Sequence, residues 1–310
     1  METIRRAVID VGTNSVKLLV ADVRGRDVQP VHEESRQTRL GKDFYEKSRL
    51  QPEAIAYTAG AVWEFVEIAR EKGTDFIRVI ATSAARDAVN PADLTASIER
   101  ACGLKTEIIS GDREADWVFQ GVATDKELVG QPLLLLDVGG GSTEFILGHS
   151  SKKSFAHSFP LGTVRLMEQF PHSDPPKKTE FAACRGWLEN FLRREVRPPL
   201  ASALEKETGK ICLVGTGGTT SILARIEKKL DRFDREKIER TVLSFEQIVA
   251  HRKNLWKLPL AERKEIPGLP KMRADVILTG VLIYEAVMEE FDLKELRVST
   301  RGLRFAAVMD

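Results

Sequence analysis

The 310-residue sequence has few cysteines, almost no net charge and no long apolar run near residue 1. Its three cysteines, Cys102, Cys184 and Cys212, are an odd number and form no Cys-x-x-Cys pair. This spacing argues against a disulfide framework and against a zinc site, and it predicts buried free thiols. Charged residues interrupt the first apolar run too early for a signal peptide, so we expect a cytoplasmic protein.

The charges of opposite sign nearly cancel, with 47 Lys and Arg against 46 Asp and Glu and a formal net charge of +1. Such a chain has no bulk positive field that would attract nucleic acid or an anionic membrane, so we expect neither as a partner. With 42% hydrophobic and 30% charged residues, the composition is that of a globular protein. At ~100–200 residues per domain, the length predicts two domains.

One sequence pattern occurs twice. Residues 6–20 align position by position with residues 133–147, and in both copies an apolar run leads through a glycine turn into a second apolar run. This pattern predicts one β-hairpin in each half of the chain. The identical residues are Asp10, Val11, Gly12 and Ser15 in the first copy and Asp137, Val138, Gly139 and Ser142 in the second.

The rest of the chain alternates between predicted strands and helices, which is typical of an α/β protein. A polar loop at 125–131, with Gly130 and Pro132 beside it, predicts the domain boundary. In the first half we expect a third strand at 27–32, a helix at 52–72, strands at 76–81 and 105–110, and helices at 91–101 and 114–121. In the second half we expect strands at 133–137, 143–148 and 153–158, a helix at 177–208 broken at Pro198-Pro199, and a strand at 210–214. A glycine turn at 215–218 then leads into a helix that ends near 229, followed by helices at 244–258 and 271–291 and a strand at 296–299.

A turn with glycine at its bend brings backbone N–H groups and a hydroxyl close to a bound oxyanion, so each turn is a candidate phosphate site. Either turn could instead be purely structural, but two equivalent turns facing each other across an interdomain cleft favour a ligand. We also expect Gly140 to require a positive φ. The candidate phosphate-binding residues are Gly12, Thr13, Asn14, Ser15, Gly139, Gly140, Gly141, Ser142 and Thr143.

Charged residues flank both turns. Asp10 and Asp137 end the strands before them, where a carboxylate could bind Mg²⁺ or cap the turn amides. Glu144 shares a strand face with Ser142 and could complete a metal site with Asp137. Lys17 occupies the equivalent position in the first copy, where it would contact phosphate or remain in solvent.

Six motifs together resemble the exopolyphosphatase/guanosine pentaphosphate phosphohydrolase family, in that family's order and across nearly the whole chain. More distant proteins, the sugar kinases, actins and chaperone ATPases, share mainly the glycine turns. The motifs are residues 9–19 (IDVGTNSVKLL), 81–88 (ATSAARDA), 109–115 (ISGDREA), 136–144 (LDVGGGSTE), 159–165 (FPLGTVR) and 214–219 (VGTGGT).

The resemblance implies an α/β fold of two ribonuclease H-like domains of the actin-like ATPase superfamily, residues 1–126 and 127–299, with the active site in the cleft between them. It implies that residues 300–310 pack back onto the first domain, although a Glu-Gly-Leu-Arg-Glu-Gly-like motif common in the family is replaced here by TRGLRFA. It further implies a Mg²⁺-dependent hydrolase that removes terminal phosphate from polyphosphate or converts guanosine pentaphosphate to tetraphosphate. The sequence is consistent with a monomer and with a homodimer.

Two catalytic residues match the family motifs. Glu114 would orient or deprotonate the attacking water, although a carboxylate in the first turn of a helix also has a purely electrostatic use. Arg86 would hold phosphate oxygens, or form a salt bridge with Asp87 or Glu114. Arg165 is a weaker candidate for the same task.

A glycine loop made by Gly217, Gly218 and Thr219 resembles the nucleoside side of the superfamily site, or caps a helix. Two functions of other classes are consistent with the same fold: an ATP-dependent small-molecule kinase and a non-catalytic sensor of guanosine penta- or tetraphosphate. A kinase has no need of a water-orienting Glu114, and a sensor would bind nucleotide without turnover.

Overall fold

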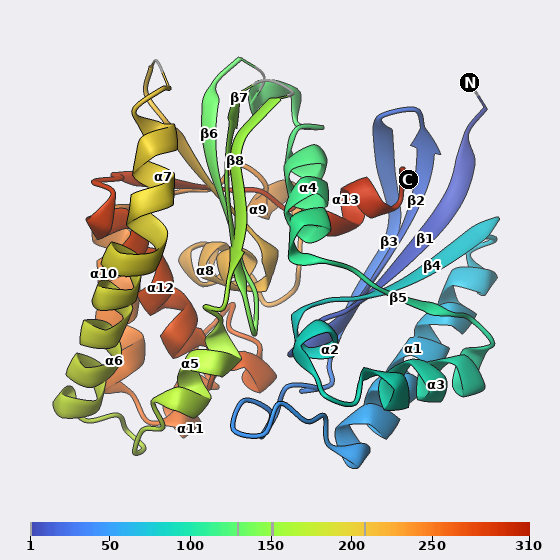
Figure 1. Ribbon diagram of the computed structural model, residues 1–310, viewed down its shortest axis with the longest axis horizontal. Coiled ribbons are helices and arrows are strands. Elements are labelled where there is room, and N and C mark those ends of the chain that lie inside the picture. The colour runs from blue at the N-terminus through green and yellow to red at the C-terminus, as the bar shows by residue number, and fades with distance from the viewer. Residues whose placement is uncertain (1, 129, 150–151, 208) are drawn as a thin grey trace. The chain divides into compact units, whose positions relative to one another are not determined.

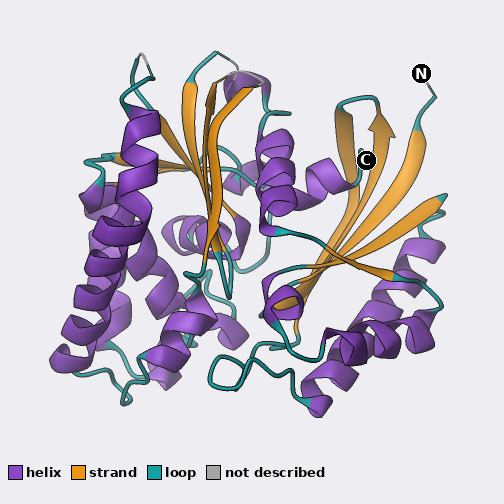
Figure 2. Ribbon diagram, in the orientation of Figure 1, coloured by secondary structure: helices purple, strands orange, loops and turns teal. Residues whose placement is uncertain are grey.

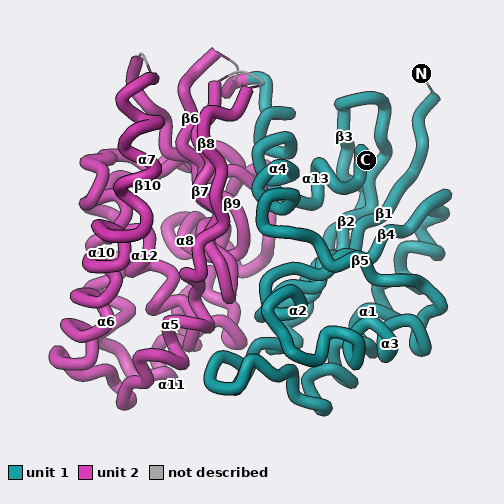
Figure 3. The backbone as a smooth tube through the Cα atoms, viewed as in Figure 1, with its two compact units in different colours: residues 1–126, 301–310 teal, residues 127–300 magenta. Residues whose placement is uncertain are grey.

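The computed structural model describes residues 2–128, 130–149, 152–207 and 209–310 (Figure 1). The chain divides into two compact units, which are Met1–Lys126 with Arg301–Asp310, and Glu127–Thr300 (Figure 3). Two predicted positions, Val129 in the boundary loop and Thr208 at a helix end, lie outside the described residues. Within these ranges, no helix has both the length and the apolar character needed to cross a membrane.

Unit 1 contains a mixed five-stranded sheet in the order β3-β2-β1-β4-β5. The β1–β2 and β2–β3 pairs are antiparallel, whereas β1, β4 and β5 are parallel, so that the last three strands end at the same edge. The strands are β1 (Ile4–Val11), β2 (Ser15–Arg24), β3 (Asp27–Gln37), β4 (Phe76–Ala81) and β5 (Thr106–Ile108).

Helices cover the unit 1 sheet (Figure 2). One face packs on the first long helix, while the last segment of the chain packs on α4 and β1. A Cβ added to Gly121 of α4 would lie 2.2 Å from the Gly302 carbonyl oxygen, so glycine permits this backbone contact. The helices are α1 (Pro52–Glu71), α2 (Ser83–Asp87), α3 (Pro91–Cys102), α4 (Gly111–Val122) and α13 (Leu303–Ala307).

Unit 2 contains a six-stranded sheet in the order β10-β11-β9-β6-β7-β8. Strands β6, β7 and β8 form an antiparallel meander, and β6, β9 and β11 are parallel. Read from its β8 edge, this sheet has the order β8-β7-β6-β9-β11, which corresponds to β3-β2-β1-β4-β5 of unit 1. Strand β10 adds an antiparallel edge beside β11. The strands are β6 (Pro132–Val138), β7 (Thr143–His149), β8 (Lys152–Phe159), β9 (Cys212–Thr216), β10 (Val242–Ser244) and β11 (Glu295–Val298).

The core of unit 2 lies between its sheet and a helical layer in which α12 is buried along most of its length. Three 3₁₀ or π segments, η1 (Lys126–Leu128), η2 (Leu192–Val196) and η3 (Lys271–Arg273), accompany the α-helices. The α-helices are α5 (Thr163–Gln169), α6 (Lys178–Phe191), α7 (Arg197–Leu204), α8 (Gly217–Lys228), α9 (Arg235–Ile238), α10 (Phe245–Lys257), α11 (Leu260–Arg263) and α12 (Ile277–Glu290).

The predicted α/β class with two repeated mixed sheets is confirmed, and the three cysteines are free thiols, two buried and Cys212 half-buried. The predicted helix break is wrong. The chain remains helical through Pro198-Pro199, and the irregularity lies before them in η2, where the Arg197 N–H donates to the Leu192 carbonyl five residues earlier. Proline rings clash with carbonyls one turn back, so the preceding turn widens instead of the helix ending.

Several other element bounds also differ from prediction. The third strand continues to Gln37, because it pairs with β2 along nearly its whole length. The strand expected at 210–214 is Cys212–Thr216, so the predicted glycine turn begins only at Gly217. The helix expected at 271–291 is divided, and between its parts the Asp275 carboxylate accepts the Val276 N–H at 2.8 Å, a local bond that competes with the helical ladder.

Candidate active site

The two glycine turns close in the same way. The Gly12 N–H donates to the Ser15 carbonyl at 3.0 Å, and the Gly139 N–H donates to the Ser142 carbonyl at 2.9 Å. A Cβ on Gly139 would lie 2.9 Å from the Ser142 oxygen, closer than side chains tolerate. Glycine at this bend therefore makes room for the carbonyl of its own turn, and the predicted approach of a phosphate stays a prediction.

The carbonyls of the first turn are held from behind by the segment that follows β3. The Gly41 N–H donates to the Thr13 carbonyl at 2.7 Å, and the amides of Thr38 and Arg39 both donate to the Asn14 carbonyl at 3.1 Å. Within the described residues, no backbone carbonyl accepts a hydrogen bond from the Thr13 or Asn14 amide. The carbonyls of this turn therefore accept hydrogen bonds from its supporting segment, and the Thr13 and Asn14 amides stay candidate donors to a phosphate.

The second turn is held by the segment after β8 in an equivalent manner. The Thr163 N–H donates to the Gly139 carbonyl at 3.0 Å, and the Val164 and Arg165 amides donate to the Gly140 carbonyl at 2.8 and 3.1 Å. The structural repeat therefore extends beyond the hairpin to the segment that supports it. The supporting segments share no sequence motif, because their contacts with the turns are made by backbone groups.

The expected positive φ at Gly140 is wrong. Gly140 and the other glycines of the two turns are not among the described glycines that have positive φ. In the contact between this turn and its supporting segment, the required glycine is Gly162, because a Cβ there would lie 2.4 Å from the Gly140 carbonyl oxygen. The packing of two backbone segments therefore explains Gly162.

Several buried polar atoms around the first turn have no hydrogen-bond partner. The Thr82 N–H donates to the Val11 carbonyl at 3.2 Å, which places the start of α2 beside this turn. An unsatisfied buried polar group costs about 1–3 kcal/mol, so a cluster of them indicates a place that a polar ligand or water completes. These atoms are Asp10 Oδ1, Asn14 Nδ2, Thr38 Oγ1 and Ser83 Oγ.

Asp10 and Lys17 are directly opposed across the β1–β2 ladder, so their side chains share one face. Burial raises the pKa of the Asp10 carboxyl, and the positive charges of Lys17 and Arg304 oppose this rise. Arg304 belongs to α13 and donates to the Leu18 carbonyl at 2.7 Å. The last helix of the chain thus supplies a cation near the first turn.

In the second hairpin the opposed pair is Asp137 and Glu144. Glu144 is 1% exposed and accepts a hydrogen bond from the Ser158 hydroxyl at 2.7 Å. Asp137 packs against the start of α8, because a Cβ on Gly217 would lie 2.3 Å from its Oδ1. The structure therefore brings together the two carboxylates that the sequence proposed for a metal.

These carboxylates fit a divalent cation. Two like charges at opposed strand positions repel each other, and a cation would offset the repulsion. Among the described residues, no group of three or more Asp, Glu, His or Cys side chains could hold an ion by itself. The set suits Mg²⁺, which binds through one or two carboxylates and takes its other oxygens from water and substrate phosphate.

Arg86 and Glu114 come together at the edge where the parallel strands of unit 1 end. Arg86 Nη1 donates to Glu114 Oε2 at 2.9 Å and to the Ile109 carbonyl at 3.2 Å. The Glu114 side chain is 10% exposed and the Arg86 side chain 22%. Helix α4 begins at its N-cap Ser110, whose hydroxyl accepts the Arg113 N–H, and this cap fixes Glu114 in the first turn.

The glycine loop before α8 contains a residue that the sequence analysis missed. Gly217 has φ +87°, and a Cβ on Gly218 would lie 2.2 Å from Arg273 Nη2. Burial lowers the pKa of the Arg273 guanidinium to about 10, and the charge of Asp275 opposes this shift. A cation therefore lies at the start of α8 near Thr219, where the helix dipole also favours an anion. The sequence gives no signal of this contact, because Arg273 and Gly218 are far apart along the chain.

Two predicted residues have structural contacts. The Thr143 hydroxyl donates to the Leu161 carbonyl at 2.6 Å and is fully buried. Arg165 Nε donates to the Gly141 carbonyl at 2.8 Å, so this arginine helps to hold the second turn in place. Their side chains thus stabilise the phosphate-site candidates from behind.

Known proteins match the chain over nearly its full length. The model of the Ppx/GppA phosphatase family matches residues 19–309. Exopolyphosphatase 2 of Mycobacterium tuberculosis is 33% identical over 300 residues, covering 94% of this chain and 92% of that protein. The solved structure of an Aquifex aeolicus PPX-GPPA enzyme has a TM-score of 0.79 at 31% identity and covers 99% of both chains. That of a Cytophaga hutchinsonii exopolyphosphatase has a TM-score of 0.86 at 29% identity, covering 97% of this chain and 96% of that one.

The fold, the paired glycine turns and these matches define a phosphohydrolase, as the motifs predicted. The chain belongs to the Ppx/GppA phosphatase family.

Proposed function

We propose that this protein hydrolyses the terminal phosphoanhydride bond of inorganic polyphosphate and releases orthophosphate. The observation that carries the proposal is the pair of equivalent glycine turns, each closed on a serine carbonyl and each with its carbonyls held by a later segment of the chain. Backbone amides of this kind bind phosphate oxygens without regard to what the phosphate is attached to. The printed names of its relatives, exopolyphosphatases, support this substrate class.

Glu114 is the proposed general base. Its carboxylate, held by Arg86 at 2.9 Å, would orient a water molecule and accept its proton as the water oxygen attacks the terminal phosphorus. The guanidinium has five N–H donors, so Arg86 could orient Glu114 and contact a phosphate oxygen at the same time. In this scheme the amides of Thr13, Asn14, Gly140 and Gly141 bind the polyphosphate, with Ser15, Ser142 and Lys17 beside them.

Mg²⁺ is the proposed cofactor, bound by Asp137 and Glu144, with Asp10 as a further candidate ligand. When bound, the ion would neutralise negative charge on the phosphate oxygens. The unpartnered Asp10 Oδ1 and the opposed Asp137–Glu144 pair are the features of this chain that suit it.

Guanosine pentaphosphate is a second candidate substrate. Arg273 beside Gly218 places a cation at the start of α8, which favours a ligand with several phosphate groups. The name of the Aquifex relative, a PPX-GPPA enzyme, is consistent with both substrates.

A phosphate-release assay tests the proposal with Mg²⁺ and three substrates: short polyphosphate, long polyphosphate and guanosine pentaphosphate. We expect release from at least one polyphosphate that disappears when Mg²⁺ is chelated. Phosphate transfer from ATP to a small alcohol, without release from polyphosphate, would identify a kinase instead. Tight nucleotide binding without turnover under any divalent metal would identify a sensor.

A further inference from the structure

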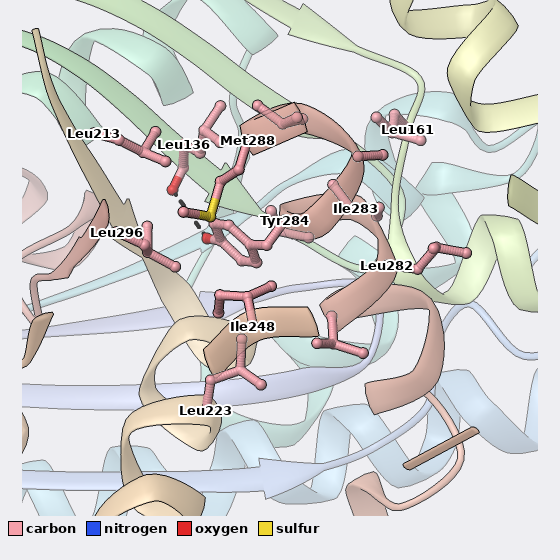
Figure 4. Packing of buried hydrophobic residues seen from close by; sticks show 14 of the residues in the cluster. Leu136, Leu161, Leu213, Leu223, Ile248, Leu282, Ile283, Tyr284, Met288 and Leu296 are labelled. Atoms are coloured by element: carbon pink, nitrogen blue, oxygen red, sulfur yellow. Dashed lines mark hydrogen bonds between the residues drawn. The ribbon is translucent and has the colours of Figure 1, made fainter. Parts of the chain in front are cut away.

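Tyr284 places a hydroxyl in the apolar core of unit 2. It lies in the middle of α12, is fully buried, and packs among Leu136, Leu223 and Leu296 (Figure 4). Phenylalanine would fill the same space without a polar atom to satisfy. The hydroxyl therefore needs an explanation other than packing.

The hydroxyl contacts the three elements that meet behind the second glycine turn. It lies 2.5 Å from the Thr220 hydroxyl on α8, 3.4 Å from the Leu136 carbonyl on β6 and 3.5 Å from the Thr216 carbonyl on β9. Because the Thr220 hydroxyl donates to the Thr216 carbonyl at 2.8 Å, the tyrosine donates its single proton to Thr220 or to a carbonyl. Figure 4 shows the bond to Leu136.

These contacts are one residue away from the proposed metal ligand. Leu136 precedes Asp137 in β6, and Asp137 is paired with Thr216 across the β6–β9 ladder. The Asp137 carboxylate also packs on Gly217, which follows Thr216. The distance between the ends of β6 and β9 therefore determines the position of the Asp137 carboxylate.

We propose that Tyr284 is a positioning residue, which holds the ends of β6 and β9 and the start of α8 together and so fixes the Asp137 carboxylate for Mg²⁺. The proposal rests on the proposed function only in taking Asp137 as a metal ligand.

Calorimetric titration of the full-length protein with Mg²⁺ alone tests this role. We expect Tyr284→Phe to bind Mg²⁺ about tenfold more weakly, the lower end of the range for residues that orient metal ligands. Thr220→Val should show the same loss, and it decides the question if Tyr284→Phe does not fold. Tyr57→Phe makes the same change at a side chain that is 57% exposed, and should leave affinity unchanged.

Turnover supplies a second readout. In Tyr284→Phe, phosphate release should fall at limiting Mg²⁺ and recover at saturating Mg²⁺, whereas a merely destabilised core would lower the melting midpoint without moving the Mg²⁺ requirement. Equal Mg²⁺ affinities in wild type and both variants, or no Mg²⁺ binding by the wild type, would overturn the role. If the wild type binds Mg²⁺ but releases no phosphate, the proposed function fails while the positioning role is still decided by the titration.

Discussion

The two glycine hairpins have equivalent backbone hydrogen bonds but different side-chain charge. In each, an aspartate ends the first strand, a glycine amide closes the turn on a serine carbonyl, and a later segment holds the turn carbonyls. The residue facing the aspartate is Lys17 in unit 1 and Glu144 in unit 2. One pair is neutral and the other carries two negative charges, so the side chains of the second hairpin suit a cation, while the backbone amides of both turns suit phosphate.

The comparison teaches that a duplicated backbone can be given two tasks by changing one side chain. Four unpartnered polar atoms lie on or beside the first turn, whereas on β9 the described residues include one such atom, Oγ1 of Thr216, the residue paired with Asp137. The first hairpin is thus the less satisfied of the two. The following predictions test this division of tasks.

The largest effect is expected from Glu114→Gln, which tests whether proton transfer depends on unit 1. The amide keeps size and can still contact Arg86 but cannot accept a proton, so turnover should fall at least ~100-fold while the melting midpoint changes little. Steady-state phosphate release measures this. Glu107→Gln, a surface carboxylate paired with Arg113, is the matched control. Near-normal turnover of folded Glu114→Gln would remove this residue from the mechanism.

The next effect addresses the charge difference itself. Asp137→Asn and Glu144→Gln should each raise the Mg²⁺ concentration for half-maximal activity by about tenfold, since each removes one of two carboxylates. Lys17→Gln should instead raise KM for polyphosphate and leave the Mg²⁺ requirement unchanged. The two titrations, of metal and of substrate, separate these outcomes, and a common shift in all three variants would show that the hairpins do not divide the tasks.

Gly140→Val sharpens the comparison by blocking one turn only. The added side chain occupies space where phosphate must approach backbone, so binding should fail while much of the fold survives. At a polyphosphate concentration of 100 Kd the wild type should gain about 2.7 kcal/mol, seen as a higher melting midpoint. The variant should show no such gain. A full ligand-induced shift in the variant would place phosphate elsewhere.

The smallest effect concerns the C-terminal segment that supports the first hairpin's sheet. Asp310 forms ion pairs with Arg78 at 3.0 Å and Arg113 at 2.9 Å, and the hydrogen bond from Arg78 lowers the pKa of its carboxyl below 3.8. A lowered pKa stabilises the fold above pH 3.8, and this contribution is lost as the pH falls through the folded-state value. Because the side chain is half-exposed, Asp310→Asn should cost less than about 1 kcal/mol at pH 7. Denaturant melts at pH 7 and pH 3 test the sign, since the difference should shrink at the lower pH.

Local patterns predicted most of the elements. The repeated hairpins and α1 follow from alternation and helical periodicity, and the bounds of α1 agree closely with the structure, whereas α4 begins at Gly111, three residues before the predicted helix. The divided helix near Asp275 and the π turn before Pro198 were not predicted. Both depend on competition between hydrogen bonds that a hydropathy pattern does not contain.

The candidate site shows the same division. Glu114, Arg86 and the turn residues are recognisable because they lie in short motifs. Arg273 and Tyr284 are not, since each acquires its meaning from a contact with residues more than fifty positions away, Gly218 and Thr220. Only the folded chain brings those pairs together.

The path of the chain has a consequence for biosynthesis. Unit 1 combines residues 1–126 with residues 301–310, so its sheet is synthesised before unit 2, whereas α13, which covers α4, is synthesised after unit 2. Until residues 303–307 leave the ribosome, the apolar surface under Phe305 has no cover, and unit 2 can fold before unit 1 is finished. A nascent chain arrested shortly after residue 126 should therefore be a better chaperone client than its length suggests.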